Sequence, residues 1–537
     1  MKSATSFLRD ARLRQLLFWC APALLAGAAI RLFLEIRMPY GYIQYDTADF
    51  LLTPYRLLSD HHYVIHSKKA FFTPTFFSIP FLLHIPALLV IPIVQHLMGL
   101  IEVILAGAII RAWFPLWRWI IIPATLLIAL SPWQLWYEQT LMGEANYVFF
   151  LVLVALLGAL WAARPTWFRF AMLALALFCI SGTRAEGKIM LLYGFALIPI
   201  AFWPRWKPIL ISFIALLVVY EAASLHGGGS HAFSLLYATL FEFTPDDIRS
   251  EPAAAPYLLP LRDATIRDGE TNPTALVTVA KNINDTLEKY LREKRHLTSK
   301  LREPIAQIER RLCIEILTRR PLDVIVTPFV KFQMATDGWA SGADFSAHFL
   351  YDKQFEAIRR LHDEVKVLSP GMTGSQMDED GMIQFARTHY YPPGMRWFTD
   401  YETAWSASSI ALRLPDRHAP QPRWAHDFIS VIPDPENVIP GIPAYFLLAF
   451  AGMLAAMLIP GRNRLVQVAF LGAMLFTWYV ATMVGVTNAR FRFAYEPFCY
   501  MYAVAALVWA VAGIHWLIIG RKHPRAPRQP ASPCTAS

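Results

Sequence analysis

The chain has 537 residues, of which 55% are hydrophobic and 17% are charged, whereas an ordinary soluble domain carries about 25% charged residues. This balance excludes a chain that is soluble throughout and indicates a protein largely embedded in lipid. The formal net charge of +9 does not indicate nucleic-acid binding, because the basic residues form short clusters beside apolar segments and no continuous patch. We therefore expect membrane lipids, and no nucleic acid, among the partners of this chain.

Apolar segments close to the length that crosses about 30 Å of hydrocarbon recur along the chain. They lie near residues 15–35, 85–110, 117–132, 143–163, 167–183, 187–203, 207–224, 441–460, 464–487 and 496–519. The sequence therefore predicts an all-α polytopic membrane protein with about ten transmembrane helices. Pro86, Pro92 and Pro123 are expected to kink helices or to shift their boundaries.

Short Lys/Arg clusters occupy alternate connections, as the positive-inside rule requires of cytoplasmic loops. These clusters contain Lys2, Arg9, Arg12 and Arg14, then Arg111 with Arg118, Arg164 with Arg169, Arg205 with Lys207, and Arg462 with Arg464. The alternation predicts a multi-pass protein of the plasma membrane, the inner membrane if the cell is bacterial, with both termini in the cytoplasm.

The same topology divides the chain into four parts. We predict an N-terminal transmembrane core over 1–225, a large extracytoplasmic segment over 226–440 between the seventh and eighth helices, C-terminal transmembrane helices over 441–520, and a disordered cytoplasmic tail over 521–537. Within the large segment, the run DTLEKYLREKRHLTSKLREPIAQIERRLCIEIL alternates charges at helical spacing, which predicts exposed or amphipathic helices.

Ionisable residues gather in the loops and helix ends that this topology places on the outer face. They are Asp46 and Asp49, Glu138 and Glu144, Arg184, Glu186 and Lys188, and Arg490, Arg492 and Glu496. Charges so close to hydrocarbon carry a desolvation cost and are functional candidates by default. Carboxylates and cations on one face fit glycosyl transfer from a polyprenyl-phosphate sugar, which needs a base for the acceptor hydroxyl and cations for the departing phosphate.

Several motifs in this order resemble the GT-C superfamily of membrane glycosyltransferases, in particular its protein O-mannosyltransferase-like and aminoarabinose-transferase-like branch. The motifs are YDTADFLLTPYRLL, KKAFFTPTFFSIPFLL, ALSPWQLWYEQTLMGEANYVFFLVL, SGTRAEGKIMLL and ARFRFAYEPFCYMYAVAAL. The chain departs from the commoner pattern at Asp49 and in TPTF, where a proline-tyrosine-proline run is frequent. The sugar therefore stays open, and the acceptor is a glycan, a lipid or a protein of the cell envelope.

The resemblance implies that Asp46 is the catalytic aspartate of the first outer loop and that Glu144 is the acidic residue that opens the fourth helix. It also implies that Arg184 and Arg490 or Arg492 lie near the donor phosphate. Asp49 is a candidate supporting carboxylate, and Lys188 and Lys69 are candidate phosphate or headgroup ligands. A requirement for a divalent metal stays open, although His61, His62 and His66 are expected to be solvated loop residues.

Each of these residues also has a purely structural interpretation. Asp46 and Glu144 are placed to cap helices, and Arg184 and Lys188 are placed to pair with Glu186. Glu496 is placed to pair with the arginines before it. Glu138 is interpreted as an ordinary interfacial residue.

The main alternative function is that of a polytopic transporter or flippase for lipid or solute. Such proteins carry charged residues along a route through the bilayer and often contain repeated halves. Here the candidate charges gather at one face and no repeat is evident, which favours an enzyme at the membrane surface. A non-catalytic scaffold is a third interpretation, and it leaves the order of the motifs unexplained.

Overall fold

The computed structural model describes residues 11–37, 70–83, 87–202, 205–225, 248–271, 275–296, 302–322, 444–458, 462–484 and 493–520, with scattered positions between 50 and 65 and Ile85; His84 and Pro86 are not described. Five predicted site residues lie outside the described residues, namely Asp46, Asp49, Lys69, Arg490 and Arg492. Most of the predicted extracytoplasmic segment and the tail over 521–537 also lie outside them.

Each of the ten predicted apolar segments contains a helix. These helices are α2 (Ala11–Arg37), α5 (Ala87–Trp113), α6 (Trp117–Leu130), α8 (Glu144–Ala163), α9 (Trp167–Thr183), α10 (Leu191–Phe202), α11 (Trp206–Leu225), α21 (Ala444–Leu458), α22 (Arg462–Val484) and α24 (Glu496–Gly520). Two further helices, α4 (Phe72–Leu82) and α7 (Pro132–Gln139), lie in predicted outer loops. The described residues thus form an all-α membrane protein.

Among the described residues, four helices are long and apolar enough to cross a membrane by themselves. They cover Leu13–Ile36, Leu89–Trp113, Glu144–Ala163 and Glu496–His515. The pair formed by α6 and α7 passes the same test when taken together, with a bend of 44° between the two helices. The remaining apolar helices do not pass this test by themselves, so the count of ten spans stays a prediction.

Ser131 and Pro132 cause the break between α6 and α7. The Ser131 hydroxyl accepts a hydrogen bond from the Gln134 backbone N–H at 3.4 Å, and Pro132 occupies the first position of α7. A serine N-cap followed by proline is a typical helix start, because proline has no N–H to leave unsatisfied there. The sequence analysis treated this stretch as a loop, and it is instead a short buried helix.

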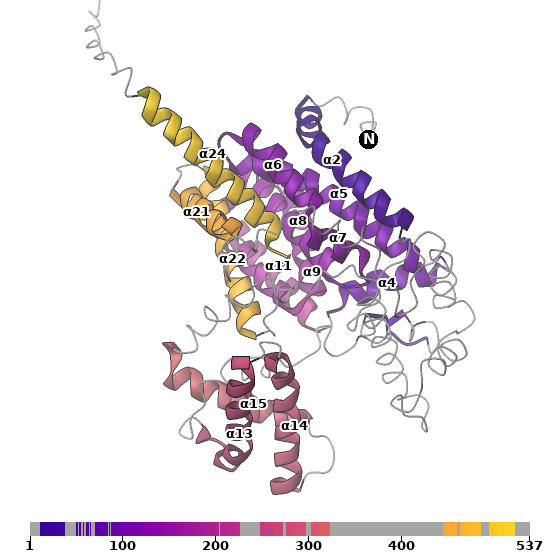
Figure 1. Ribbon diagram of the computed structural model, residues 1–537, viewed down its shortest axis with the longest axis vertical. Coiled ribbons are helices and arrows are strands. Elements are labelled where there is room, and N and C mark those ends of the chain that lie inside the picture. The colour runs from indigo at the N-terminus through magenta and orange to yellow at the C-terminus, as the bar shows by residue number, and fades with distance from the viewer. Residues whose placement is uncertain are drawn as a thin grey trace, which may run out of the picture.

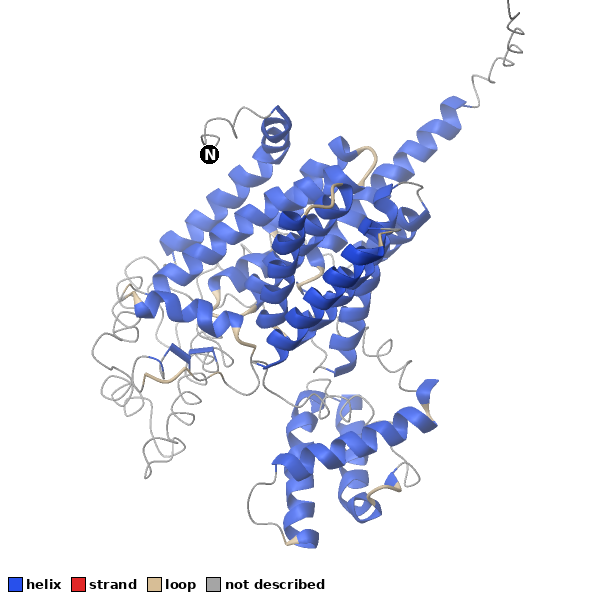
Figure 2. Ribbon diagram, turned by 180° about the vertical axis from the view of Figure 1, so that it is seen from behind, coloured by secondary structure: helices blue, strands red, loops and turns tan. Residues whose placement is uncertain are grey.

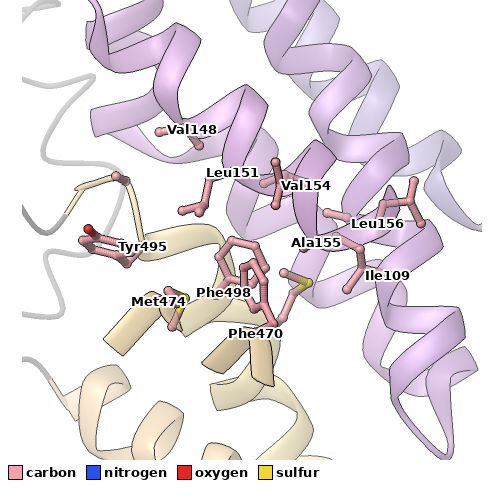
Figure 3. Close-up of a cluster of buried hydrophobic side chains, with 14 of the residues drawn as sticks. Ile109, Val148, Leu151, Val154, Ala155, Leu156, Phe470, Met474, Tyr495 and Phe498 are labelled. Carbon is pink, nitrogen blue, oxygen red and sulfur yellow. The ribbon is translucent and has the colours of Figure 1, made fainter. Parts of the chain in front are cut away.

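The centre of the bundle forms around α8, and Figure 3 shows part of this core. Leu151, Val154 and Ala155 of α8 are fully buried and belong to the same cluster as Phe470 and Phe498. The Phe470 and Phe498 rings lie 4.7 Å apart, which joins α22 to α24. Helices far apart in the sequence therefore share one core, and the start of α8 is held next to the start of α24.

Different helices lie at the two ends of the bundle. In Figures 1 and 2 the start of α2 and the end of α24 lie at one end, and α13 (Ala255–Thr271), α14 (Ala275–Arg295) and α15 (Arg302–Arg319) lie beyond the other. The described start of α2 and end of α24 thus lie on the side opposite the described helices of the large segment. The assignment of these sides to cytoplasm and exterior stays a prediction.

The helices α13–α15 form a separate unit with a core of its own. Leu258, Leu287 and Leu312 are fully buried in it. At its edge the Glu251 carboxylate accepts hydrogen bonds from Arg295 Nη2 at 2.7 and 2.9 Å and from the Tyr290 hydroxyl. The prediction of amphipathic helices in this charged run is confirmed, since their apolar faces make this core.

Candidate functional site

Three predicted site residues are described, and two of them meet. Glu144 Oε1 accepts a hydrogen bond from Arg184 Nη1 at 3.1 Å, although 40 positions separate the two residues in the sequence. Glu144 opens α8, and Arg184 lies at the C-terminal end of α9. The side chain of Lys188 is half-buried on the short 3₁₀ helix η1 (Ala185–Met190) that follows.

Glu144 is a buried carboxylate at a helix N-terminus. Its side chain is 2% exposed, and it lies in the first turn of α8, where the partial positive charge of the helix end stabilises an anion by about 0.3–1 kcal/mol. The N-cap position of α8 is Gly143 and no side-chain hydrogen bond caps the helix, so Glu144 contributes a first-turn carboxylate to the cluster and not a cap.

Arg184 is the centre of this cluster. Its Nε donates to Glu186 Oε1, and its guanidinium carbon lies 5.8 Å from the centre of the Tyr147 ring. The residue has an extended backbone, with φ −145° and ψ 152°, because α9 ends at Thr183. The Arg184 side chain is 14% exposed, so it lies at the edge of the protein interior and not deep inside it.

Glu496 provides a second buried carboxylate at a helix start. It is 1% exposed at the beginning of α24 and accepts hydrogen bonds from the hydroxyls of Ser131 at 3.3 Å, Tyr445 at 3.1 Å and Tyr500 at 3.1 Å. The predicted partners Arg490 and Arg492 lie outside the described residues. Glu496 therefore links α7, α21 and α24 through hydroxyl groups, a role that the sequence analysis did not predict.

The interpretation of Glu138 as an ordinary interfacial residue is wrong. Its side chain is fully buried on α7, and both carboxylate oxygens accept hydrogen bonds from Arg31 of α2, at 2.7 Å from Nε and 2.7 Å from Nη2. The helix α7 folds back against α5, which removes Glu138 from the interface. A buried carboxylate requires such a partner, because an isolated charge in the interior is strongly unfavourable.

The Arg31–Glu138 pair belongs to a larger polar network among α2, α5 and α7. His96 Nδ1 lies 2.7 Å from Glu138 Oε2, and His96 Nε2 lies 2.8 Å from Gln139 Oε1. Deeper in the bundle, Gln134 Nε2 donates to Glu102 Oε2 at 3.0 Å. The sequence signal was present, because Arg31 and Glu102 are charges inside predicted spans and such residues are rare and functional in membranes.

No group of three or more His, Cys, Asp or Glu side chains that could hold a metal ion is found among the described residues. His61 and His62 are described and exposed, as expected of solvated loop histidines. His66 lies outside the described residues.

No family model matches the chain, and no curated protein matches it in sequence. Two crystal structures of the Archaeoglobus fulgidus oligosaccharyltransferase, one tethered to an acceptor peptide containing the NVT sequon through a disulfide bond and one in the apo form, align with it at 12% identity. Their TM-scores are 0.41 and 0.35, with 95% and 96% of this chain covered.

The chain spans about half the length of these structures, with 52% and 53% of them covered. A likeness with this identity and TM-score carries no argument about activity. The case for a function therefore rests on the residues of this chain and on the way in which the bundle brings them together.

Proposed function

We propose that this protein is a membrane glycosyltransferase that transfers a sugar from a polyprenyl-phosphate-linked donor to an acceptor at the outer, periplasmic face. The observation that carries the proposal is the contact between Glu144 and Arg184, two candidates chosen from separate predicted outer loops. Glu496 opens a neighbouring helix at the same end of the bundle. The GT-C-like order of the sequence motifs supports the same assignment.

The reaction requires two kinds of group, and the candidates include both. The bond between the anomeric carbon and the phosphate oxygen breaks as the acceptor oxygen attacks from the opposite side, which inverts the anomeric centre. The acceptor proton passes to a carboxylate, for which Asp46 is the first candidate and Asp49 and Glu144 are the others. The departing phosphate takes the electron pair, and nearby cations stabilise its negative charge.

Arg184 is the best-supported phosphate ligand. An arginine presents several N–H donors in a fixed fork, which suits phosphate as well as carboxylate. Donor binding would exchange part of its contact with Glu144 and Glu186 for phosphate oxygens. Lys188 has no ion-pair partner in the part of the chain that the structure describes, and it adds a mobile positive charge. We propose that the cations around the phosphate also include Arg490, Arg492 and Lys69.

The surrounding topology follows from the same proposal. Both termini are cytoplasmic, and the segment over 226–440 lies outside, where its α13–α15 unit helps to recognise a glycan, lipid or protein acceptor. The proposal places Glu144 and Arg184 at the bundle end beyond which α13–α15 lie in Figures 1 and 2. Donor and acceptor would thus meet between the bundle and the large segment.

The test is transfer of labelled sugar from a panel of polyprenyl-phosphate donors by the purified protein in lipid, with a total envelope extract as the source of acceptors. We expect Asp46→Asn to lower kcat by about 10²–10⁴-fold, and Arg184→Gln to raise the KM for the donor. Glu221→Gln is the matched control, because Glu221 is an exposed carboxylate on α11, outside the proposed donor and acceptor sites. A wild-type protein that consumes no donor would exclude this function, and a fully active Asp46→Asn variant would exclude Asp46 as the base.

One observation favours the alternative of a transporter. Glu102 lies near the middle of the apolar span of α5, is fully buried and is hydrogen-bonded to Gln134. The sequence analysis had placed the candidate charges at one face only, so this residue weakens that argument. Flux of labelled lipid-linked sugar across proteoliposomes without any new glycosidic bond, and its loss in Glu102→Gln, would support transport over transfer.

A further inference from the structure

Arg31 makes an unusual set of contacts for an arginine inside a membrane helix. Its side chain is 3% exposed, and Nε and Nη2 both donate to Glu138, while Nη1 donates to the Ala129 carbonyl at 2.9 Å and to the Gly27 carbonyl at 3.1 Å. All three nitrogens therefore bind protein atoms. Four of its five N–H donors are used within the protein, and the side chain is buried, which distinguishes it from a substrate-binding arginine.

The contacts of Arg31 join the two helices on either side of a break. Ala129 belongs to the last turn of α6, and Glu138 belongs to α7. A carbonyl in a last turn has no N–H partner within its own helix, and Pro132 has no N–H to offer. Arg31 supplies the missing donor to α6 and an ion pair to α7, so one guanidinium fixes how the two helices meet.

Residues of α5 extend this set of contacts towards Glu144. His96 contacts the side chains of Glu138 and Gln139, and the Gln95 amide donates to the Met142 carbonyl at 3.2 Å. Met142 lies two positions before Glu144. A continuous set of contacts thus runs from Arg31, along α7, to the residues that lead into α8.

Gly99 of α5 makes room for this arrangement. A Cβ atom added at Gly99 would collide with the Glu138 carboxylate and lie 2.9 Å from Arg31 Nη2. The close approach of α5 to the ion pair therefore depends on the absence of a side chain at this position. The Arg31–Glu138 ion pair and the space left by Gly99 therefore belong to one packing arrangement.

We propose that Arg31 and Glu138 are positioning residues, which hold α7 and residues 140–143 in place so that Glu144 meets Arg184. This proposal rests on the proposed function for its catalytic consequence, but the holding of residues 140–143 is measurable without it. The pair acts through the backbone that precedes Glu144, and it does not touch the substrate.

The test separates the geometry of the pair from its charge. Replacing both members in Arg31→Met/Glu138→Met removes the ion pair without leaving a lone buried charge, a change that is often neutral for stability. We expect the double variant to keep the thermal midpoint of the wild type. We expect backbone amides over residues 140–147 to exchange hydrogen at least about tenfold faster, because the α6–α7 junction is released. We also expect kcat for sugar transfer to fall by roughly 10²-fold at constant donor KM.

Two further variants complete the design. Arg31→Lys keeps the charge but cannot form the paired hydrogen bonds, so it should restore neither kcat nor the slow exchange in full. Arg169→Met is the matched control, because Arg169 also donates to carbonyls at a helix end, Leu160 O at 2.6 Å and Arg164 O at 3.3 Å, but far from α7. It should leave exchange over residues 140–147 unchanged.

Unchanged exchange over residues 140–147 in the double variant would overturn the proposal, as would full kcat. Full recovery in Arg31→Lys would overturn it as well, since charge alone would then be sufficient. If the wild type transfers no sugar, the proposed function fails, and the exchange measurement alone decides whether the Arg31–Glu138 pair holds this segment.

Discussion

Two arginine–glutamate pairs in the same bundle differ in how completely the protein satisfies them. Arg31 and Glu138 are 3% and 0% exposed, and their contact is bidentate with two distances of 2.7 Å. Arg184 and Glu144 are 14% and 2% exposed, and Arg184 Nη1 donates to Glu144 Oε1 at 3.1 Å. The first pair lies between packed helices, and the second lies where a helix end meets a short 3₁₀ helix.

This difference separates a holding role from a binding role. A fully desolvated bidentate pair loses a great deal when one member is replaced, and its burial keeps a ligand away from it. A pair at the edge of the interior can exchange one carboxylate contact for a phosphate oxygen at a modest cost. We therefore propose an architectural role for the Arg31–Glu138 pair and a substrate-binding role for the Arg184–Glu144 pair.

The largest expected effect is that of Arg31→Met alone. It leaves Glu138 buried without its guanidinium partner, and the loss of unfolding free energy should reach about 3–5 kcal/mol. Arg184→Met should cost only about 1–2 kcal/mol, because Glu144 keeps the favourable position at the N-terminus of α8. Denaturant titration of both variants in the same micelles measures the difference, and equal losses would break the distinction between the pairs.

Glu309 in the α13–α15 unit is a buried carboxylate without an arginine partner among the described residues. It shows how such a group makes stability depend on pH. It is 2% exposed, its Oε1 atom has no hydrogen-bond partner, and burial raises its pKa from 4.5 to about 7. Because the folded pKa is the higher one, the stabilisation is complete below pH 4.5 and is lost as the pH rises to about 7 and beyond. The full shift corresponds to about 3 kcal/mol.

Glu309→Gln should remove this pH dependence. At pH 8 the peptides of α15 should exchange hydrogen more slowly in the variant than in the wild type, whereas at pH 4 the two should agree. Comparison at the same pH cancels the intrinsic dependence of exchange on pH. A wild-type α15 that is as protected as the variant at pH 8 would show that Glu309 has found a partner or water.

A smaller effect is expected from Gly99→Ala, which disturbs the Arg31–Glu138 pair without removing either charge. The added methyl collides with the Glu138 carboxylate, and overpacking of this kind costs about 1–3 kcal/mol. Gly472→Ala on α22 is the matched control, because no atom lies within 4 Å of the added Cβ. It should stabilise the helix by about 0.5–1 kcal/mol. Equal unfolding free energies for the two variants would show that Gly99 is not needed for packing.

The helices themselves were predictable from the sequence, because long apolar runs between charged or proline-containing breaks leave few alternatives in a membrane. The helix α7 was missed because PWQLWYEQ is neither long nor uniformly apolar. Its start was nevertheless encoded by Ser131 and Pro132, a cap signal that becomes decisive only when the segment is buried.

The candidate site was predictable in part. Glu144 and Arg184 follow from charges at span ends, and the structure joins them. The Arg31–Glu138 partnership was not predictable, because it depends on α7 folding back towards α2 across 107 positions of sequence. A charge inside a span signals that a partner exists, but only the three-dimensional arrangement identifies it.

The smallest expected effect comes from two helix caps of the same kind, one at each end of the bundle. Ser131 caps α7 and also donates to Glu496, whereas Thr166 caps α9 by accepting from the Arg169 N–H at 3.3 Å. Ser131→Ala and Thr166→Ala should each cost about 1 kcal/mol of unfolding free energy, since both remove a cap. Only Ser131→Ala should lower sugar transfer, because it also releases the start of α24 at the Glu144 end of the bundle. Equal activities of the two variants at equal stability would show that the contact between α7 and Glu496 is only structural.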